Sequence, residues 1–292
     1  PTKALARDQY PKIKKFADKI KINVKVFDGD TKIEERREII EKSPEILITN
    51  FDVLHYHLWH QTKFSSILSS TKILVVDEAH VYSGIFGTNV HYIIKRLKRI
   101  CNNKLQFVAA SATLDDAKTF CEQLFGEKMQ LIKGSGKKGE TDFVMLFPSL
   151  RTQRKLMVEL TKKLTDKNHK TMVFSNSHLN AELLAMQAKK QKINIKVHRA
   201  GLMANYRMSV EKQFKEDKLQ AISCTPTLEL GIDVGNVDCV ISSTIPVNRL
   251  TQRIGRAARK GQRGYAFLAL GNDPISQYYK NHPDDYFEDI EK

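Results

Sequence analysis

The chain has 292 residues, of which 41% are hydrophobic, and its formal net charge is +15. This length suggests two packed domains, and no apolar stretch approaches the roughly 20 residues that a membrane-spanning helix requires. The excess of lysine and arginine favours a polyanionic partner such as nucleic acid, although a lysine-rich surface that merely keeps the chain in solution explains the charge alone equally well.

The spacing of the cysteines and the polarity of the N-terminal residues indicate the cellular compartment of the protein. The four cysteines show no Cys-x-x-Cys spacing, so they indicate neither a zinc site nor a disulfide framework. Residues 1–20 lack the pattern of a signal peptide. We therefore expect reduced thiols and a cytoplasmic protein, which would be associated with the nucleoid in a prokaryote.

Short apolar runs alternate with amphipathic stretches along the whole chain. The predicted strands are 24–27, 45–49, 73–77, 107–110, 143–147, 171–175, 195–198, 221–224, 239–242 and 265–270. The predicted helices are 33–41, 90–100, 115–125, 150–164, 179–191, 206–216 and 250–258. This alternation predicts α/β domains with parallel sheets covered by helices.

A Gly-rich, charged stretch at residues 133–140 is the best linker candidate. It predicts a first domain over residues 1–136 and a second over 137–271. Residues 272–292 are polar and aromatic, and we expect them to begin a further C-terminal region.

The run Ile-Leu-Val-Val at 73–76 ends in Asp77 and Glu78. A buried strand would place both carboxylates at its carboxyl edge, where Asp77 could hold Mg²⁺ through water and Glu78 could orient and deprotonate an attacking water. Solvated acids at a strand end are an equally good interpretation of the pair alone. His80 follows at a spacing that lets it face a neighbouring strand or the second domain.

Hydroxyl residues follow the next predicted strand, at Ser111 and Thr113. Beside the two acids, these hydroxyls could hydrogen-bond the carboxylates and couple their state to the rest of the molecule. Thr113 could also cap the helix that follows, and both roles can hold together.

Several strand-to-helix junctions carry basic or hydroxyl residues of the kind that binds phosphate with the help of backbone N–H groups. They are Thr2, Lys3, Arg7, Thr49, Asn50 and Arg199. After the strand 221–224, Thr225 and Thr227 could donate their hydroxyls to a nucleic-acid phosphate. Asp233, after a turn at Gly231, could reach a ribose or couple to the arginines of the later stretch 252–259. An ordinary strand–loop–helix connection explains this last stretch as well.

The stretch 252–259 reads Gln-Arg-Ile-Gly-Arg-Ala-Ala-Arg and begins at Gln252. Arg256 and Arg259 are three residues apart, which predicts that they share one helical face, and Gly255 permits a close approach. Two such arginines offered to a phosphate site on another domain would act as arginine fingers. A basic surface helix is the less favoured alternative.

Three histidines near the single tryptophan invite a metal interpretation. His55, His57 and His60 do not share one helical face, so the spacing argues against a metal site. Trp59 is better explained by core or interface packing.

Taken in order, these motifs resemble those of a superfamily 2 helicase. Residues 1–8 are similar to motif Ia, 49–50 to motif Ib, 77–80 to the DEAH form of motif II, 111–113 to motif III, 173–177 to motif IV, 225–233 to motif V and 252–259 to motif VI. The stretches 27–31, 48–55, 80–88, 228–233 and 277–283 narrow the resemblance to MrfA/YprA-type helicases and their fungal Hrq relatives. Those proteins are ATP-dependent 3′-to-5′ DNA translocases implicated in DNA repair.

The resemblance implies two RecA-like domains that hold ATP and Mg²⁺ between them and move on single-stranded or forked DNA as a monomeric motor, with no membrane partner. Nucleotide-binding residues would be Asp77, Glu78, His80, Gly231, Asp233, Gln252, Arg256 and Arg259, with Glu78 and the two arginines catalytic. The strand would run over Thr2, Lys3, Arg7, Thr49, Asn50, Arg199 and Thr225, and Ser111 and Thr113 would couple the sites. An RNA helicase, or a nucleic-acid-binding fragment without catalysis, are the alternatives.

The sequence departs from the family pattern in two places. It contains no Gly-x-x-x-x-Gly-Lys-Thr loop, which in the family cradles the phosphates upstream of motif Ia. It also lacks the cluster of four metal-binding cysteines that follows the motor. We therefore expect a fragment whose first domain is truncated at its N-terminus and is the weaker of the two.

Overall fold

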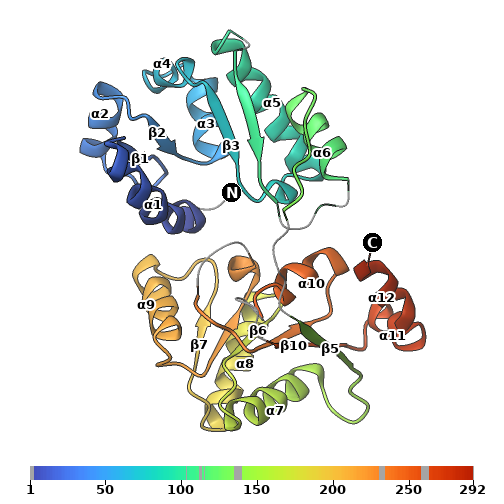
Figure 1. The fold of residues 1–292 in the computed structure, drawn as a ribbon. Coiled ribbons are helices and arrows are strands. Elements are labelled where there is room, and N and C mark those ends of the chain that lie inside the picture. Colours follow the sequence, from blue (N-terminus) through green and yellow to red (C-terminus); the bar gives the residue numbers. More distant parts are fainter. Residues whose placement is uncertain are drawn as a thin grey trace. The chain divides into compact units, whose positions relative to one another are not determined.

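The computed structural model describes residues 3–102, 104–111, 114, 116–134, 140–229, 234–257 and 263–291. The chain divides into two compact units, Pro1–Lys133 (unit 1) and Gly134–Lys292 (unit 2) (Figure 1). The predicted boundary between residues 136 and 137 lies outside the described residues, so its position stays a prediction. In the described segments, no helix is both long and apolar enough to cross a membrane.

Unit 1 contains two parallel strand pairs. In the first pair, β1 (Val24–Val26) lies beside β2 (Ile46–Ile48), and in the second, β3 (Ile73–Val76) lies beside β4 (Gln106–Ala109). The helices are α1 (Lys3–Ala17), η1 (Asp18–Ile20), α2 (Ile33–Glu41), α3 (Phe51–Trp59), α4 (Phe64–Ser69), η2 (Ala79–Val81), α5 (Gly84–Ile100) and α6 (Ala117–Phe125).

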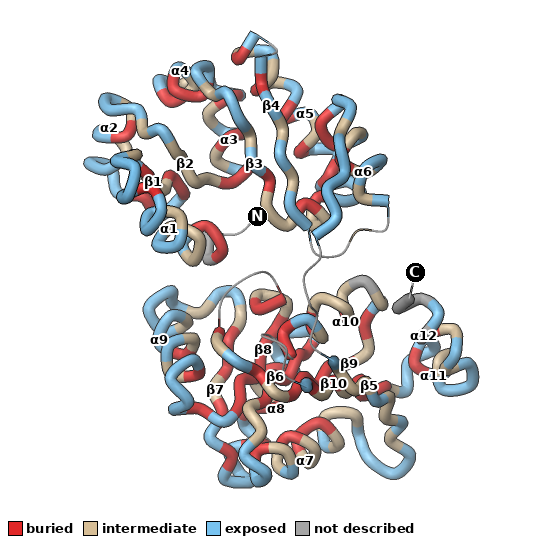
Figure 2. The backbone as a smooth tube through the Cα atoms, viewed as in Figure 1, coloured by how far each residue is buried: buried red, intermediate tan, exposed pale blue. Residues whose placement is uncertain are grey.

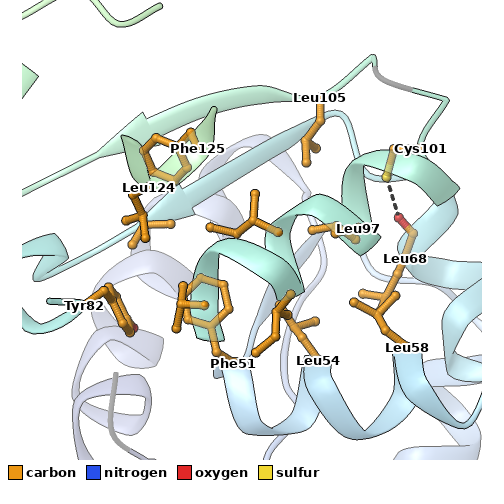
Figure 3. Close-up of a cluster of buried hydrophobic side chains, with 14 of the residues drawn as sticks. Phe51, Leu54, Leu58, Leu68, Tyr82, Leu97, Cys101, Leu105, Leu124 and Phe125 are labelled. Atoms are coloured by element: carbon orange, nitrogen blue, oxygen red, sulfur yellow. Dashed lines mark hydrogen bonds between the residues drawn. The ribbon is translucent and has the colours of Figure 1, made fainter. Parts of the chain in front are cut away.

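The core of unit 1 lies between its helices and one face of its strands. Phe51, Leu54 and Leu58 of α3 point toward Leu97 of α5, and Phe125 of α6 completes the cluster (Figure 3). The other face of β3 and β4 is open, because Ile73, Val75 and Val108 are 52%, 64% and 43% exposed. Side chains alternate along a strand, so only one side of this pair is covered within unit 1.

Unit 2 has a single six-stranded parallel sheet in the order β5-β10-β9-β6-β8-β7. Its strands are β5 (Thr141–Leu146), β6 (Thr171–Phe174), β7 (Ile195–His198), β8 (Ala221–Cys224), β9 (Cys239–Ser243) and β10 (Gly264–Ala269). Its helices are α7 (Gln153–Asp166), α8 (His178–Lys190), α9 (Ala204–Lys215), η3 (Pro226–Leu228), α10 (Val247–Ile254), α11 (Pro274–Asn281) and α12 (Pro283–Glu291). Every residue of β6, β8 and β9 is buried, which gives this unit the deeper core (Figure 2).

The predicted α/β class with parallel sheets is confirmed in both units. Two helices differ most in extent from the prediction. The helix predicted over 90–100 begins at Gly84, and that predicted over 250–258 runs from Val247 and ends at Ile254, where Gly255 follows. Glycine is a poor helix former, which accounts for the earlier end. Helices α1, α3, α4, α11 and α12 were not predicted.

Candidate nucleotide and nucleic-acid sites

Asp77 and Glu78 lie directly after β3, as predicted. The backbone N–H of Glu78 donates to Oδ1 of Asp77 at 2.9 Å, and the amide of Gln9 on α1 donates to Oδ2 of Asp77 at 3.3 Å. Glu78 has φ 51° and ψ 48°, a left-handed conformation that costs a residue with a side chain about 1–2 kcal/mol. Strain of this kind, held by the surrounding fold, is typical of functional sites.

His80 lies within contact distance of both Glu78 and Ser111, the latter just after the neighbouring strand β4. Its Nδ1 lies 3.5 Å from Oε2 of Glu78 and 3.0 Å from Oγ of Ser111, beyond β4. The backbone N–H of Ala79 donates to the carbonyl of Ala110 at 3.0 Å and fixes the same two strand ends. Ser111 was predicted to bond the carboxylates, whereas the hydrogen bond found for its hydroxyl is to the histidine beside them.

The donor set at this edge suits Mg²⁺ that carries phosphate ligands. Among the described residues, no group of three or more His, Cys, Asp or Glu side chains could enclose a metal ion. Mg²⁺ in nucleotide sites commonly takes one or two carboxylates, several waters and substrate phosphates, so Asp77 fits as its protein ligand.

Tyr82 is a buried neighbour of the acids that the sequence interpretation missed. It is 4% exposed and packs edge-on against Phe51, with ring centroids 5.0 Å apart. Burial raises the pKa of its hydroxyl far above the ordinary value, and the charges of Asp77 and Asp52 add to the shift. The hydroxyl therefore stays protonated.

Arg7, predicted to bind nucleic acid, is tied to unit 1 by a buried carboxylate. Its Nε and Nη2 lie 3.2 and 3.3 Å from the two oxygens of Asp28, which is fully buried. Burial alone would raise the pKa of Asp28, but hydrogen bonds from Arg7, the Asp30 N–H and Thr31 outweigh it and hold that pKa below its ordinary value. Arg7 itself remains 46% exposed, so a second partner can still reach it.

Thr49 and Asn50 lie at the end of β2, as predicted, but both already have partners within the fold. Thr49 donates its hydroxyl to the carbonyl of Phe27 at 2.7 Å. Asn50 is 8% exposed and caps α3, since its Oδ1 accepts from the N–H of Val53 at 3.0 Å. The structure therefore assigns Asn50 a capping role that the sequence interpretation did not consider.

Two arginines of unit 2, Arg249 and Arg253, donate to the same carboxylate, that of Glu229. Glu229, 7% exposed, accepts from Arg253 Nε at 2.6 Å and from Arg249 Nη2 at 3.0 Å. Arg253 is fully buried and also donates to Ser242 Oγ at 2.7 Å and to Asn176 Oδ1 at 3.3 Å. Burial lowers the pKa of Arg253, and the charge of Glu229 opposes part of that shift.

The expectation that Arg256 and Arg259 share a helical face is wrong in one respect. Helix α10 ends at Ile254, so Arg256 lies beyond it. Arg256 is 4% exposed and its Nη2 donates to the backbone carbonyl of Glu229. In this conformation it is folded into unit 2 instead of being offered outward, while Gln252 lies on α10 and is partly buried.

The remaining predicted residues of unit 2 line the ends of β7 and β8. Arg199 donates to Glu182 Oε1 at 2.8 Å and is 24% exposed. Thr225 is 2% exposed, so its hydroxyl is not on the surface as we had expected for a phosphate contact. The more accessible Thr227 lies 3.1 Å from Nδ1 of the buried His198.

Several predicted site residues fall outside the described residues, so their placement stays a prediction. They are Thr2, Thr113, Gly231, Asp233 and Arg259. Lys3 begins α1, and only its backbone is described. Within each unit, the described candidates gather at the carboxyl ends of the strands, the edge at which ligands bind parallel α/β sheets.

Comparison with known proteins shows which protein families this chain is similar to. Residues 1–120 match the DEAD/DEAH box helicase model, and residues 152–261 match the model for the helicase conserved C-terminal domain. The chain is 34% identical to an uncharacterised ATP-dependent helicase of Methanocaldococcus jannaschii, over all of this chain and 45% of that protein. It is 32% identical to the ATP-dependent helicase hrq1 of Schizosaccharomyces pombe, over 97% of this chain and 30% of that one.

Among solved structures, the DUF1998 helicase MrfA bound to DNA superposes with a TM-score of 0.89 at 32% identity, over 99% of this chain and 41% of MrfA. Helicase Lhr of Mycobacterium smegmatis, bound to single-stranded DNA and AMP-PNP, gives 0.76 at 25% identity, over 94% of this chain and 40% of Lhr. The chain thus spans less than half the length of each of these relatives. Two RecA-like helicase domains are the fold of units 1 and 2.

Proposed function

Because the chain belongs to the superfamily 2 DEAD/DEAH-box helicases of the MrfA, YprA and Hrq1 type, we propose that it is the motor of an ATP-dependent DNA helicase. The proposed motor moves 3′-to-5′ on single-stranded or forked DNA as a monomer and serves DNA repair. The observation that carries this proposal is the His80 contact, which joins the Asp77–Glu78 pair to Ser111 beyond the next strand.

In the proposed reaction, Glu78 orients the attacking water and accepts its proton at the side-chain carboxylate. His80 and the strained backbone at Glu78 hold that carboxylate in place. Asp77 would hold Mg²⁺, which neutralises phosphate charge when it is bound. Gln9, which donates to Asp77, orients the carboxylate from α1.

Arg256 and Arg259 of unit 2 are proposed to contact nucleotide phosphates. Arg256 would leave the carbonyl of Glu229 and stabilise the charge that develops on the transferred phosphate. Arg253 remains buried against Glu229 and keeps the start of this segment in place. Release of Arg256 after hydrolysis would restore the arrangement that the structure describes.

Two solved relatives at 25% identity or more favour a DNA substrate over RNA. MrfA and Lhr, at 32% and 25% identity, were solved with DNA. The helicases solved with RNA are near 20% identity, a level that supports the fold alone. Backbone contacts at strand-end loops imply little sequence preference and strong salt dependence.

Strand displacement by the complete gene product tests the substrate and the direction together. Duplexes with a 3′ single-stranded tail, a 5′ tail, or an RNA loading strand would be supplied with ATP and Mg²⁺. We expect unwinding of the 3′-tailed DNA alone. Equal unwinding of the 5′-tailed duplex would refute the polarity, and unwinding only from the RNA strand would reverse the choice of DNA.

A further inference from the structure

A basic and aromatic surface covers the outer sides of two neighbouring helices of unit 1. We call it the α3–α5 surface; it consists of His55 and Trp59 on α3 and of Tyr92, Lys95, Arg96 and Arg99 on α5. The four residues of α5 recur at the spacing of one helical face and line a shallow depression. Trp59 is 66% exposed and Tyr92 is 52% exposed.

The cations of this surface lack the acidic partners found elsewhere in unit 1. Helix α5 contains no Asp or Glu, and Lys98 on its other side pairs with Glu127. Among the described residues, no carboxylate lies within ion-pair distance of Lys95, Arg96 or Arg99. Two lysines elsewhere in the unit do pair with acids, Lys14 with Asp18 at 2.8 Å and Lys25 with Glu38 at 3.1 Å.

Arg96 of α5 contacts both Trp59 and His55 of α3, which positions a cation beside the exposed aromatic ring. The guanidinium of Arg96 lies 5.6 Å from the centre of the Trp59 ring, and its Nη1 lies 3.0 Å from Nδ1 of His55. This contact fixes the indole at the surface while two thirds of it stays exposed. A large aromatic ring beside unpaired cations offers both a stacking surface and phosphate partners.

The α3–α5 surface is separate from the strand-end residues of unit 1. Helix α5 begins after the carboxyl end of β3 and leads back to the start of β4, so residues 92–99 lie toward the opposite edge. Trp59 lies about 13 Å along α3 from Asn50, at 1.5 Å per residue. A base stacked on a strand-end loop would therefore not touch the indole.

We propose that the α3–α5 surface is a second nucleic-acid site, where a base of a single strand stacks on Trp59 and the adjoining phosphates pair with Lys95 and Arg99. An acidic protein segment would use the cations but would leave the exposed Trp59 and Tyr92 without a planar partner, so the rings favour nucleic acid. The site needs no nucleotide hydrolysis, so it stands or falls independently of the motor function.

Trp59 is the only tryptophan among the 292 residues, so its fluorescence reports on this surface directly. Oligodeoxythymidylate would be titrated into the full chain without ATP at several salt concentrations. Base stacking is expected to quench the emission in a saturable way. In Lys95→Gln/Arg99→Gln, we expect weaker quenching and a salt dependence whose log–log slope is smaller by about 1.4, since each single-strand phosphate contributes about 0.7.

Lys15→Gln/Lys19→Gln is the matched control, because it removes two exposed cations of the same unit at the same spacing. It should keep the wild-type quenching curve and slope. Identical curves for the two double variants would overturn the proposal, as would an absence of quenching by DNA. Quenching by polyglutamate but not by the oligonucleotide would assign the surface to an acidic protein segment and would also overturn it.

Discussion

Glu229 is the residue on which the described chemistry of unit 2 depends most. Its carboxylate is shared by the fully buried Arg253 and the 38% exposed Arg249, and its carbonyl accepts from Arg256. A buried charge pair contributes little net stability when intact, but removal of one partner leaves the other uncompensated. Asn176, Ser242 and Glu229 thus hold Arg253 as one hydrogen-bonded group.

Glu229→Gln should therefore destabilise unit 2 by about 3–5 kcal/mol, because Arg253 would keep its buried charge without a carboxylate. Arg249→Gln removes the exposed partner and should cost about 1 kcal/mol or less. Denaturant unfolding followed by far-UV circular dichroism measures both changes. Equal losses for the two variants would show that Glu229 does not stabilise the buried arginine.

Sequence analysis located the two acids after β3 and the histidine beside them, because a short apolar run followed by Asp and Glu is a local pattern. The hydrogen-bonded group around Glu229 could not be predicted in this way, because its members are far apart in the sequence. Arg249 and Arg253 lie 20 and 24 residues after Glu229. Asn176, which bonds Arg253, precedes that arginine by 77 residues. The capping role of Asn50 was within reach, since an Asn directly before an apolar helix is a local signal.

At the scale of elements, polar residues help to attach α1 and α3 to the rest of unit 1. Asn50 caps α3, which supplies Phe51, Leu54 and Leu58 to the core. Arg7 ties α1 to Asp28 after β1. The strands were predicted to within about two residues, because β-branched runs mark them clearly, whereas α3 was missed because its aromatic sequence carries little helical periodicity.

Substitutions of Asn50 can separate the cap from a nucleic-acid role. Asn50→Ala should lower the stability of unit 1 by about 1 kcal/mol, and Asn50→Asp should restore it because aspartate also caps helices well. Thermal unfolding followed by Trp59 fluorescence measures the change. If Asn50 also meets a phosphate, Asn50→Asp should weaken single-strand binding while stability is kept; unchanged binding would leave the cap as its whole role.

The Arg7–Asp28 pair predicts how unit 1 responds to acid. The pKa of Asp28 is lower in the folded chain than its ordinary value, so its contribution to stability is present above about pH 4 and is lost as the pH falls below it. In Asp28→Asn, the free energy of unfolding, measured by denaturant unfolding at a series of pH values, should depend less on pH in this range. Asp18→Asn, at an exposed pair with Lys14, should leave that dependence on pH unchanged. If the free energy of unfolding of Asp28→Asn still falls steeply below about pH 4, Asp28 is not the cause of the acid sensitivity.

At the scale of the whole molecule, the two units differ in how completely their sheets are covered. Unit 2 has a continuous six-stranded sheet with three fully buried strands. The described strands of unit 1 form two separate pairs, and Val75 and Val108 sit opposite one another on an exposed face. Apolar surface left in water contributes nothing to folding, so we expect unit 1 to be the less stable of the two.

Unfolding of the chain should then occur in two steps. Trp59 lies in unit 1, so its fluorescence should change at a lower denaturant concentration than the bulk of the far-UV circular dichroism signal, to which unit 2 contributes. Glu229→Gln serves as an internal check, because it should shift only the later transition. Coincident transitions by both probes would show that the units unfold together and would refute the difference in stability.

DNA-stimulated ATP hydrolysis by the complete gene product tests most directly the proposal that Glu78 drives a nucleotide-hydrolysing motor. Turnover would be measured with single-stranded DNA, with single-stranded RNA and without polymer, for the wild type and for Glu78→Gln. We expect stimulation by DNA, and a loss of turnover of at least about hundredfold in Glu78→Gln while ATP binding is retained. Undiminished turnover in Glu78→Gln would contradict the role of Glu78, and stimulation by RNA alone would contradict a DNA-dependent motor.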